Sequence, residues 1–406
     1  MLQAIHLKDF KSFVDEEVTL APLTVLVGAN ASGKSNLLDA IRFVQGLGLG
    51  FSVLDVLQGR WEAGREVWRG LRGGVAETVH HGKSSARLLT TWRLESPPWA
   101  HHVEFELKPK PVLVEEWFKN VSSRTGEWWA GGSARFSDEQ LEAVVDGFHL
   151  GTEIATPFER SMLSLPSFLM KSGAGEPPPA LAPGLKAQEQ ILGTLKNSVL
   201  LNLMPERMRG YSPKQAGQLG AEGEHLSSML WSLCQDEKVR QEWVDWLSEL
   251  LAPELVGIDF IETELGDVML TLVEEGGTRT SARSLSDGTL RFLGMLVALR
   301  TAPPGSLVMM EEPETGLHPQ RVHLLVEYME AVTKERGIQV ITTTHSPQLL
   351  QSLSNEGLRN AVLCARVPDH PGTVLRRLGD LPHFDEVLPR SSIDRLFTTG
   401  WLERAL

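Results

Sequence analysis

Cysteine is scarce in this chain of 406 residues, which contains only Cys234 and Cys364. Two cysteines exclude a disulfide framework and a zinc site built from four thiolates. Long apolar runs are also missing, because no stretch offers the roughly 18 uncharged apolar residues that cross a bilayer. The opening residues, MLQAIHLKDF, lack the basic and apolar regions of a signal peptide. We therefore expect a cytoplasmic protein without a membrane-spanning segment.

Basic residues are outnumbered, since 39 Lys and Arg face 52 Asp and Glu and leave a formal net charge of −13. A surface of this sign repels nucleic acid on average, so contact with DNA would require a local basic patch. The candidate region lies between Lys196 and Lys214, where Arg207 and Arg209 are close together. Glu206 dilutes this set, and a solvated surface is the simpler interpretation.

The length favours two or three lobes over a single core. Alternating or continuous apolar residues predict strands in the first part of the chain, at 3–7, 17–27, 86–94, 102–107 and 112–117. From about residue 136 the pattern changes, and a capping-box-like start at Ser137 predicts a helix over 137–148. Further helices are expected over 186–205 and 221–252. After residue 255, strands and helices alternate, which predicts a largely parallel sheet.

The segment from Leu23 to Phe43 combines an apolar run, a loop of small residues and an amphipathic helix. The loop has the pattern G-x-x-x-x-G-K-S from Gly28 to Ser35. Its glycines let several backbone N–H groups converge on one anion at a helix N-terminus. Lys34 can reach the β- and γ-phosphates of a nucleotide, and the Ser35 hydroxyl can bind Mg²⁺. A chance match has a frequency on the order of one in a hundred chains of this length, so we expect a nucleotide site.

An apolar run over 307–310 ends in Glu311 and Glu312. Beside a phosphate loop, one such carboxylate can hold the magnesium shell and the next can orient or deprotonate the attacking water. Glu311 is one methylene longer than the Asp that is usual there, which can move its contact with Mg²⁺ onto a water. Without the phosphate loop, a solvated strand end would be an equally good interpretation.

Two further motifs are weak when taken alone. Ser286, Asp287 and Gly288 open a helix with Ser286 as N-cap, and they can form a second anion site, but a plain helix cap is the simpler interpretation. His345 follows a β-branched strand and can contact a γ-phosphate, although a lone histidine is more often structural.

Together the motifs follow the order G-x-x-x-x-G-K-S-N, L-S-D-G-T, apolar-E-E-P-E and T-T-H-S-P. In this order they resemble the ABC-type ATPase heads of SMC and RecF-like repair proteins. The pattern is most similar to the ATPase domain of the overcoming-lysogenization-defect (OLD) family and related stand-alone ATPases. The segment LKDFKSF, residues 7–13, is similar to the one that precedes the phosphate loop in those heads.

The resemblance implies an α/β fold, namely a P-loop NTPase with an ABC-type head and a helical insertion. The head would contain a mostly parallel sheet and an antiparallel β subdomain. Its N-terminal lobe would be 1–135 and its C-terminal lobe 256–406. Between them, 136–255 would form the mainly helical insertion, with a Pro- and Gly-rich linker at 172–184.

The resemblance also implies that two heads share ATP and Mg²⁺. Ser286 and Gly288 of one subunit would face the γ-phosphate held by the other, and the segment 314–318 would couple the two sites. The implied catalytic residues are Glu312 as general base, His345 as the γ-phosphate switch, and Lys34. The implied metal ligands are Ser35 and Glu311. The implied nucleotide contacts are Lys11, Ser12, Gly28, Asn30, Ala31, Ser32, Gly33, Lys34, Ser35, Asn36, Ser286, Asp287 and Gly288.

Some expected features are missing. Full OLD nucleases carry a TOPRIM domain, but the residues after His345 show no matching pattern of acids, so we expect no nuclease activity from this chain alone. The pairs at 80–81 and 101–102 are adjacent histidines that do not share one face, which argues against a metal site. Arg72 lies in RGLRGG, where SMC heads carry a basic loop, but a solvated loop is the simpler interpretation. The family's glutamine-containing loop has no evident position.

Two functions remain open. The first is an ATPase whose ATP-dependent dimer regulates a separate effector, such as a nuclease or toxin, in DNA repair or anti-phage defence. The second is a slow ATP-gated scaffold or sensor that holds such a partner. A transporter ATPase is less favoured, because those proteins lack a helical insertion of this size.

Overall fold

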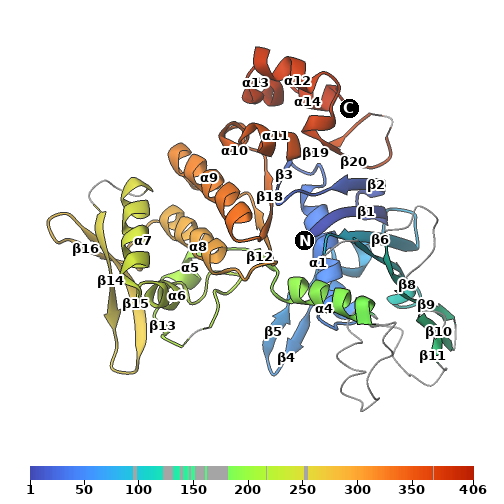
Figure 1. Cartoon of the computed structure of the whole chain (residues 1–406), viewed down its shortest axis with the longest axis horizontal. Helices are drawn as coiled ribbons and strands as arrows, with labels where there is room; N and C mark the ends of the chain where they lie inside the picture. Colours follow the sequence, from blue (N-terminus) through green and yellow to red (C-terminus); the bar gives the residue numbers. More distant parts are fainter. Residues whose placement is uncertain are drawn as a thin grey trace.

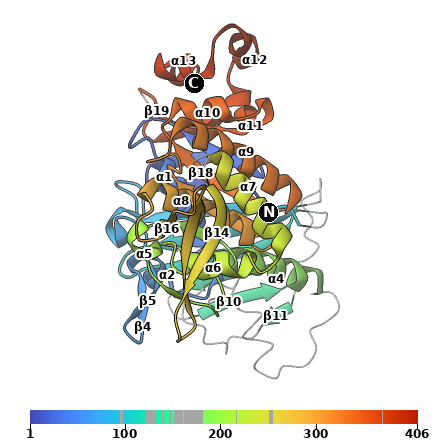
Figure 2. The ribbon, with the colours of Figure 1, turned by 90° about the vertical axis from the view of Figure 1, so that its left-hand side faces the viewer.

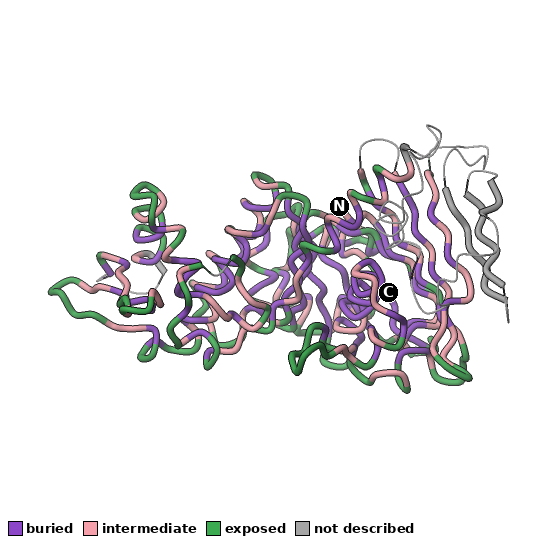
Figure 3. The backbone as a smooth tube through the Cα atoms, turned by 90° about the horizontal axis from the view of Figure 1, so that it is seen from below, coloured by how far each residue is buried: buried purple, intermediate pink, exposed green. Residues whose placement is uncertain are grey.

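The computed structural model describes residues 1–94, 98–121, 131–137, 140–145, 148–150, 161, 182–215, 217–250, 255–368 and 370–406. Three larger sheets follow one another along the longest axis of the molecule (Figure 1). A small antiparallel sheet lies at one end, a mostly parallel sheet lies in the middle, and a large antiparallel sheet lies at the other end. Buried segments run through the middle of the molecule, and exposed residues concentrate in the outer loops (Figure 3).

The central sheet has six strands in the order β12-β17-β18-β3-β19-β20. Neighbouring strands are parallel except for β19 and β20, which are antiparallel. Every residue of β3 and β18 is buried, as expected for parallel strands that are covered on both faces. The bounds are Val199–Leu201 (β12), Leu307–Glu311 (β17), Gln339–Thr344 (β18), Leu23–Val27 (β3), Val362–Arg366 (β19) and Thr373–Arg377 (β20).

Successive side chains of the central strands enter two different cores. Leu26 and Met309 pack on one face, with α1 and the large antiparallel sheet. Val25 and Val308 pack on the opposite face, with α8 and α9. The covering helices are α1 (Lys34–Gly48), α8 (Asp287–Thr301) and α9 (Pro319–Glu335). The central sheet is therefore the wall that both cores share.

The strands β3, β17 and β18 run in the same direction, so the segments that follow them lie at one edge of the sheet. These segments begin with Gly28, Glu312 and His345. Strand order therefore brings together three motifs that are far apart in the sequence.

The large antiparallel sheet has the order β11-β10-β9-β8-β7-β6-β1-β2 and contains strands at the predicted positions 3–7, 86–94, 102–107 and 112–117. The single strand predicted over 17–27 is instead divided between the end of β2 and all of β3, which belongs to the central sheet. The bounds are Leu2–Phe10 (β1), Phe13–Thr19 (β2), Ser85–Trp92 (β6), Trp99–Glu106 (β7), Val112–Asn120 (β8), Gly131–Ser137 (β9), Gln140–Val145 (β10) and Phe148–Leu150 (β11).

The helix predicted over 137–148 is wrong, because residues 140–145 and 148–150 form the strands β10 and β11. β10 pairs antiparallel with both β9 and β11. A local capping signal is only a weak preference, and hydrogen bonding to neighbouring strands overrides it here.

The rest of the middle region combines helices with one strand of the central sheet. β12 pairs with β17, so residues 199–201 contribute to the central sheet and not to a separate insertion. Residues 172–181 of the predicted linker lie outside the described residues, and the three-part division of the chain stays a prediction. The helices here are α4 (Ala182–Lys196), α5 (Pro205–Met208), α6 (Leu226–Leu233) and α7 (Glu237–Leu250).

The small sheet has the order β13-β15-β14, with β16 also paired to β15. It faces the viewer in Figure 2, with α6 and α7 beside it. Its bounds are Ser212–Pro213 (β13), Leu255–Glu262 (β14), Asp267–Glu274 (β15) and Arg279–Ser281 (β16).

The remaining elements are short. They are α2 (Val53–Gln58), β4 (Arg60–Glu62), β5 (Arg65–Trp68), α10 (Pro347–Ser352), α11 (Asn355–Asn360), α12 (Phe384–Val387), α13 (Ile393–Thr398) and α14 (Trp401–Arg404). Across the described ranges, no helix combines the length and the apolar character that a membrane span requires.

Gln339, the first residue of β18, links the central sheet to the large antiparallel sheet. Its buried side chain donates to the carbonyl oxygens of Leu2 at 2.8 Å and Ala21 at 3.1 Å. Its Oε1 accepts a hydrogen bond from the Leu2 N–H at 3.0 Å. One amide therefore satisfies three backbone groups where the two sheets meet.

Replacing Gln339 with Leu should remove these hydrogen bonds from the N–H and carbonyl groups of Leu2, while the Ala21 carbonyl keeps the hydrogen bond that it accepts from Thr24. We expect the free energy of unfolding to fall by about 2–4 kcal/mol, because each unpaired buried polar group costs about 1–3 kcal/mol. Urea denaturation measures this change. Gln235→Leu alters an exposed glutamine and should shift stability by less than about 0.5 kcal/mol. Equal free energies of unfolding of the two variants would contradict the stabilising role of Gln339 between the two sheets.

Candidate functional site

The phosphate loop connects β3 to α1, and its glycines are required by close neighbours. A Cβ on Gly33, where φ is 107°, would lie 2.5 Å from Thr373 Oγ1. A Cβ on Gly28 would lie 2.1 Å from the carbonyl oxygen of Cys364. Real Cβ atoms do not approach other atoms so closely, so no larger residue fits at either position. Cys364 and Thr373 lie on β19 and β20, which therefore help to shape the loop.

Lys34 bends back over the loop. Its Nζ donates to the carbonyl oxygens of Gly28 at 2.7 Å and Ala29 at 2.9 Å. Burial lowers the pKa of the Lys34 ammonium below its ordinary value, although the nearby acids oppose this effect. Charged phosphate oxygens are stronger acceptors for an ammonium group than carbonyl oxygens are. The lysine is therefore placed to exchange these contacts for a phosphate.

The loop also contains a buried polar atom that lacks a partner. The Ser32 hydroxyl makes no hydrogen bond with any described residue. A hydroxyl, a lysine ammonium and backbone N–H groups at a helix N-terminus fit a ligand with several acceptor oxygens, as in a nucleotide phosphate. The predicted contacts Asn30 and Ala31 form the exposed part of the loop.

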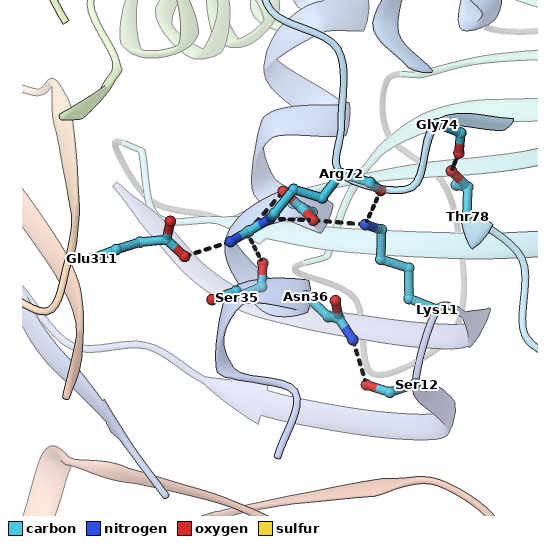
Figure 4. A network of polar contacts seen from close by, with 9 residues as sticks. Lys11, Ser12, Ser35, Asn36, Arg72, Gly74, Thr78 and Glu311 are labelled. Atoms are coloured by element: carbon cyan, nitrogen blue, oxygen red, sulfur yellow. Dashed lines mark hydrogen bonds and ion pairs between the residues drawn. The ribbon is translucent and has the colours of Figure 1, made fainter. Parts of the chain in front are cut away.

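Ser12 and Asn36 attach the loop to the turn between β1 and β2 (Figure 4). The Asn36 amide donates to Ser12 Oγ at 2.8 Å, and Ser12 Oγ also lies 2.9 Å from Thr373 Oγ1. Ser12 therefore lies against the first turn of α1, to which Asn36 belongs, and these hydrogen bonds hold the loop in place.

Lys11 and Arg72 share one buried acid, Asp39 of α1 (Figure 4). The Asp39 side chain has no exposed surface, and Lys11 Nζ lies 2.7 Å from its Oδ2. Arg72 Nη2 lies 3.0 Å from Oδ1, and its Nε donates to Oδ2 at 3.1 Å. Lys11 was predicted to contact nucleotide, but its ammonium is directed to Asp39 and to the carbonyl oxygen of Arg72, also at 2.7 Å.

Arg72 also reaches the acidic strand end. Its Nη1 donates to Glu311 Oε1 at 2.7 Å, and its Nη2 donates to the carbonyl oxygen of Ser35 at 2.6 Å. Burial alone would lower the pKa of Arg72, but Asp39 and then Glu311 outweigh it and raise that pKa. Arg72 is exposed, as expected for a solvated loop, but it also makes these specific contacts, which the sequence did not predict. The sequence could not reveal this contact, because Glu311 lies 239 positions further along the chain.

Glu312 has an unusual backbone and a specific partner. Its φ is 45°, in the left-handed region, and its N–H donates to the carbonyl oxygen of Thr343 at 3.1 Å. Its Oε1 lies 3.0 Å from His345 Nδ1. A backbone of this kind costs about 1–3 kcal/mol and persists where the surrounding structure enforces it, often at functional sites. The parallel pairing of β17 and β18 therefore brings the predicted base and the predicted switch histidine into contact.

Glu314 is a half-buried acid in the segment predicted to couple two sites. One carboxylate oxygen accepts a hydrogen bond from the Thr344 hydroxyl, and the other has no hydrogen-bond partner among the described residues. Burial is the main cause that raises the pKa of Glu314 above its ordinary value, against the hydrogen bond from Thr344. A charge at this position is therefore costly in the folded state.

A small cavity next to the acidic strand end reveals a polar residue that the sequence analysis missed. Asn202 lines it together with Arg291, Glu311, Glu312 and Thr315. Asn202 directly follows β12, and that strand is too short to be recognised from an apolar pattern. Asn202 therefore lines the same cavity as both acids because β12 joins the edge of the central sheet.

Ser286 caps α8 as predicted, since its Oγ accepts a hydrogen bond from the N–H of Thr289 at 3.1 Å. Ser286 and Asp287 are exposed, although most of α8 is buried. A Cβ on Gly288 would lie 2.4 Å from the carbonyl oxygen of Gly316, so packing alone requires glycine there. Among the described residues, no hydrogen bond or ion pair joins this motif to the phosphate loop, and its use by a second head stays a prediction.

Arg209 supports the segment that leads into α8. It donates to the carbonyl oxygens of Ala282, Arg283 and Leu285 at 2.6–3.2 Å, and it pairs with Asp287 at 2.5 Å. The sequence suggests Arg209 as part of a basic patch, but its guanidinium already makes these hydrogen bonds and the ion pair with Asp287.

Two other cations of that region, Arg207 and Lys214, are also paired. Arg207 lies 3.5 Å from Glu222, and Lys214 lies 2.7 Å from Glu262. These ion pairs reduce the net positive charge that the region could offer to DNA.

The histidine pair at 101–102 points to opposite faces of the large sheet, as adjacent residues of a strand do. His101 is buried, 2.7 Å from Glu116. His102 stacks on Trp117 and forms a group with Glu104 and Glu115 whose possible ligand atoms lie within 4.8 Å of one another. The sequence did not predict this cross-strand group. Since an arginine, Arg87, already pairs with Glu104 at 3.0 Å, we assign no metal to it.

Two family descriptions match separate parts of the chain. "AAA ATPase domain" matches residues 1–57, which include the phosphate loop. "AAA domain, putative AbiEii toxin, Type IV TA system" matches residues 201–351, which include the α8 motif, the acidic strand end and His345.

Curated relatives align over short segments. The "DNA replication and repair protein RecF" of Synechococcus sp. (strain JA-2-3B'a(2-13)) is 48% identical over 44 residues, which cover 11% of this chain and 12% of that protein. The same-named protein of Synechococcus sp. (strain JA-3-3Ab) is 33% identical over 108 residues, which cover 26% of this chain and 23% of that protein. The aligned segments therefore span at most about a quarter of these relatives.

One solved structure, "Crystal structure of the SmcHead bound to the C-winged helix domain of ScpA", aligns with 92% of this chain and 96% of its own. The TM-score is 0.51 and the sequence identity is 12%, so the likeness concerns the fold alone. Fold and motifs thus define a P-loop ATPase with an ABC-type head, which confirms the predicted α/β class. Within this class, the chain is similar in fold to an SMC head, and short segments of it are similar in sequence to RecF proteins. The closer likeness to the OLD family stays a prediction.

Replacing Glu314 with Gln should stabilise the protein at neutral pH. Because burial raises the pKa of Glu314 in the folded state, its deprotonation costs stability above that pKa, and the cost disappears as the pH falls through the unfolded value near 4.5. Thermal unfolding of both proteins from pH 8 to pH 5 should therefore show a gain in melting temperature that shrinks as the pH falls. Glu275→Gln, at an exposed position, should show no such trend. A gain for Glu314→Gln that did not vary with pH would count against the buried charge.

Proposed function

We propose that this chain binds and hydrolyses ATP with Mg²⁺ at the carboxyl edge of its central sheet. The observation that carries the proposal is the 3.0 Å contact between Glu312 Oε1 and His345 Nδ1, at neighbouring strand ends beside the phosphate loop. Glu312 and the phosphate loop thus occur together in a chain that matches family models described as ATPase domains.

Each residue has a definable task in this proposal. Lys34, Ser32 and the loop N–H groups orient the phosphates. Glu312 accepts a proton from the attacking water, and His345 orients the Glu312 carboxylate. Mg²⁺, when bound, neutralises charge on the phosphate oxygens. Ser35 and Glu311 are the residues that would hold it.

We further propose that the site is completed by a second copy of the chain. Ser286 and Asp287 are exposed at the N-terminus of a long and otherwise buried helix, where backbone N–H groups are available to an anion. A γ-phosphate bound to the phosphate loop of one head would contact this end of α8 in the other. ATP would then join two heads, and hydrolysis would separate them.

A separate effector protein would use this cycle. The family description for residues 201–351 names a toxin system, the RecF proteins are named for DNA replication and repair, and the SMC head was solved with ScpA. The RecF name supports a role in DNA repair, and the toxin-system description supports a toxin as partner. A role in anti-phage defence and a nuclease as partner rest on the resemblance of the sequence motifs alone. A slow scaffold or sensor is the second candidate, because Lys34 and Arg72 already occupy the loop carbonyls and Glu311 without ligand.

Replacing Glu312 with Gln should lower ATP hydrolysis by about 100- to 10,000-fold, since it removes the general base and leaves the side chain of nearly equal size. Phosphate release under saturating Mg-ATP measures the rate. Glu275→Gln is the matched exposed control and should hydrolyse ATP normally. Undiminished hydrolysis in Glu312→Gln would contradict the role of the base.

Light scattering of Glu312→Gln with and without Mg-ATP tests the shared site. Doubling of the solution mass with ATP supports the head dimer, and Ser286→Arg in the same background should abolish it. A monomer in both states would contradict the shared site. A multimer that ATP does not change would point to assembly through other surfaces.

A further inference from the structure

Arg72 lies between the two residues that would hold Mg²⁺. Its guanidinium donates to Glu311 Oε1 at 2.7 Å and to the backbone carbonyl of Ser35 at 2.6 Å (Figure 4). A magnesium ion binds carboxylate and hydroxyl oxygens at about 2.1 Å, and it does not share a carboxylate oxygen easily with a guanidinium, because the two cations repel. The contact at Glu311 therefore competes with the proposed metal.

The charges of the network are already balanced. Asp39 and Glu311 supply two negative charges, and Lys11 and Arg72 supply two positive ones. Lys11 and Asp39 are almost fully buried, whereas the side chains of Arg72 and Glu311 are 46% and 35% exposed. The inner half of the network is therefore enclosed, and the outer half is open to exchange with a ligand.

The arginine can leave Glu311 without becoming unpaired. Its Nε and Nη2 bond to the two oxygens of Asp39, a paired geometry that holds one side of the guanidinium. Its Nη1 is the nitrogen that bonds to Glu311. A change of the outer contacts therefore leaves the buried carboxylate of Asp39 neutralised.

The backbone around Arg72 is held from both sides. The carbonyl of Arg69 accepts from Arg42 at 2.6 Å, the carbonyl of Arg72 accepts from Lys11 at 2.7 Å, and the carbonyl of Gly74 accepts from Thr78 at 2.6 Å. These bonds limit movement of the loop itself. The exchange at Glu311 is thus a movement of the side chain.

We propose that Arg72 is a positioning residue that occupies Glu311 until metal binds, and that it thereby sets the Mg²⁺ requirement of the site. This inference rests on the proposed nucleotide function. Arg72 holds the Glu311 carboxylate in place in the unliganded head, and it keeps an unneutralised acid from facing the phosphate loop. Binding of metal with nucleotide requires the guanidinium to release Glu311 and retain Asp39.

The test compares binding of a fluorescent, non-hydrolysable ATP analogue to the full chain in EDTA and at saturating Mg²⁺. The ratio of the dissociation constant in EDTA to that in Mg²⁺ reports how much Mg²⁺ strengthens binding. Any direct contact of Arg72 with the nucleotide affects both constants, so its effect cancels in the ratio. In Arg72→Met the ratio should be about tenfold larger than in the unaltered protein. Metal no longer displaces a hydrogen bond between charged groups in this variant.

Two further variants keep the test decisive. Arg72→Lys retains a cation for Asp39 but cannot bridge to Glu311 and Asp39 in the same way, so its ratio should lie between those of Arg72→Met and the unaltered protein. Arg69→Met changes an exposed arginine of the same loop and should leave the ratio unchanged. A purely structural Arg72 would alter the melting temperature without altering the ratio.

The outcomes separate the two proposals. An unchanged or smaller ratio in folded Arg72→Met and Arg72→Lys overturns the role of Arg72, while the nucleotide site stands. Absence of analogue binding to the unaltered protein in both EDTA and Mg²⁺ overturns the proposed function, and with it this inference.

Discussion

The carboxylate of Asp39 is removed from solvent, and its neutralisation organises the candidate site. A buried charge is tolerated when it is paired and hydrogen-bonded. Lys11 reaches it from the turn after β1, and Arg72 reaches it from the loop after β5. Both contacts join segments of the N-terminal part of the chain to α1. Arg72 also forms an ion pair with Glu311 at the end of β17. The contacts of Asp39 that anchor α1 are therefore part of one network with the acidic end of that strand.

Features that cost folding free energy concentrate at the edge of the central sheet where β3, β17 and β18 end. Lys34 is partly desolvated, Glu312 has a left-handed backbone, and Glu314 is a half-buried acid with a raised pKa. Strain and perturbed pKa values of this kind are typical of sites where a ligand or a partner later replaces protein contacts. The loop carbonyls bond to Lys34, and Arg72 bonds to Glu311; the proposed phosphates and metal would take over these contacts.

Local patterns predicted the parts of the site whose chemistry is itself local. The phosphate loop could be read directly, because its N–H groups, Lys34 and the start of α1 are consecutive in the chain. Ser286 could be recognised as a helix cap for the same reason. The helix expected over 137–148 failed because strand pairing outweighed a capping signal. Asn202 was missed because a strand of three residues has no recognisable period.

The sequence by itself determined the ABC-type class and the identities of the phosphate loop, the acidic pair and the histidine. The phosphate loop and the acidic pair depend on residue types at fixed short spacings, and the class and the histidine depend on the resemblance carried by the order of the four motifs, which a single chain displays without folding. Only the tertiary structure decided that Glu312 contacts His345, that β12 belongs to the central sheet, and that Arg72 connects Asp39 to Glu311. These contacts join residues far apart in the chain. Their formation depends on strand order and register, which arise from packing of the whole core and not from any local pattern.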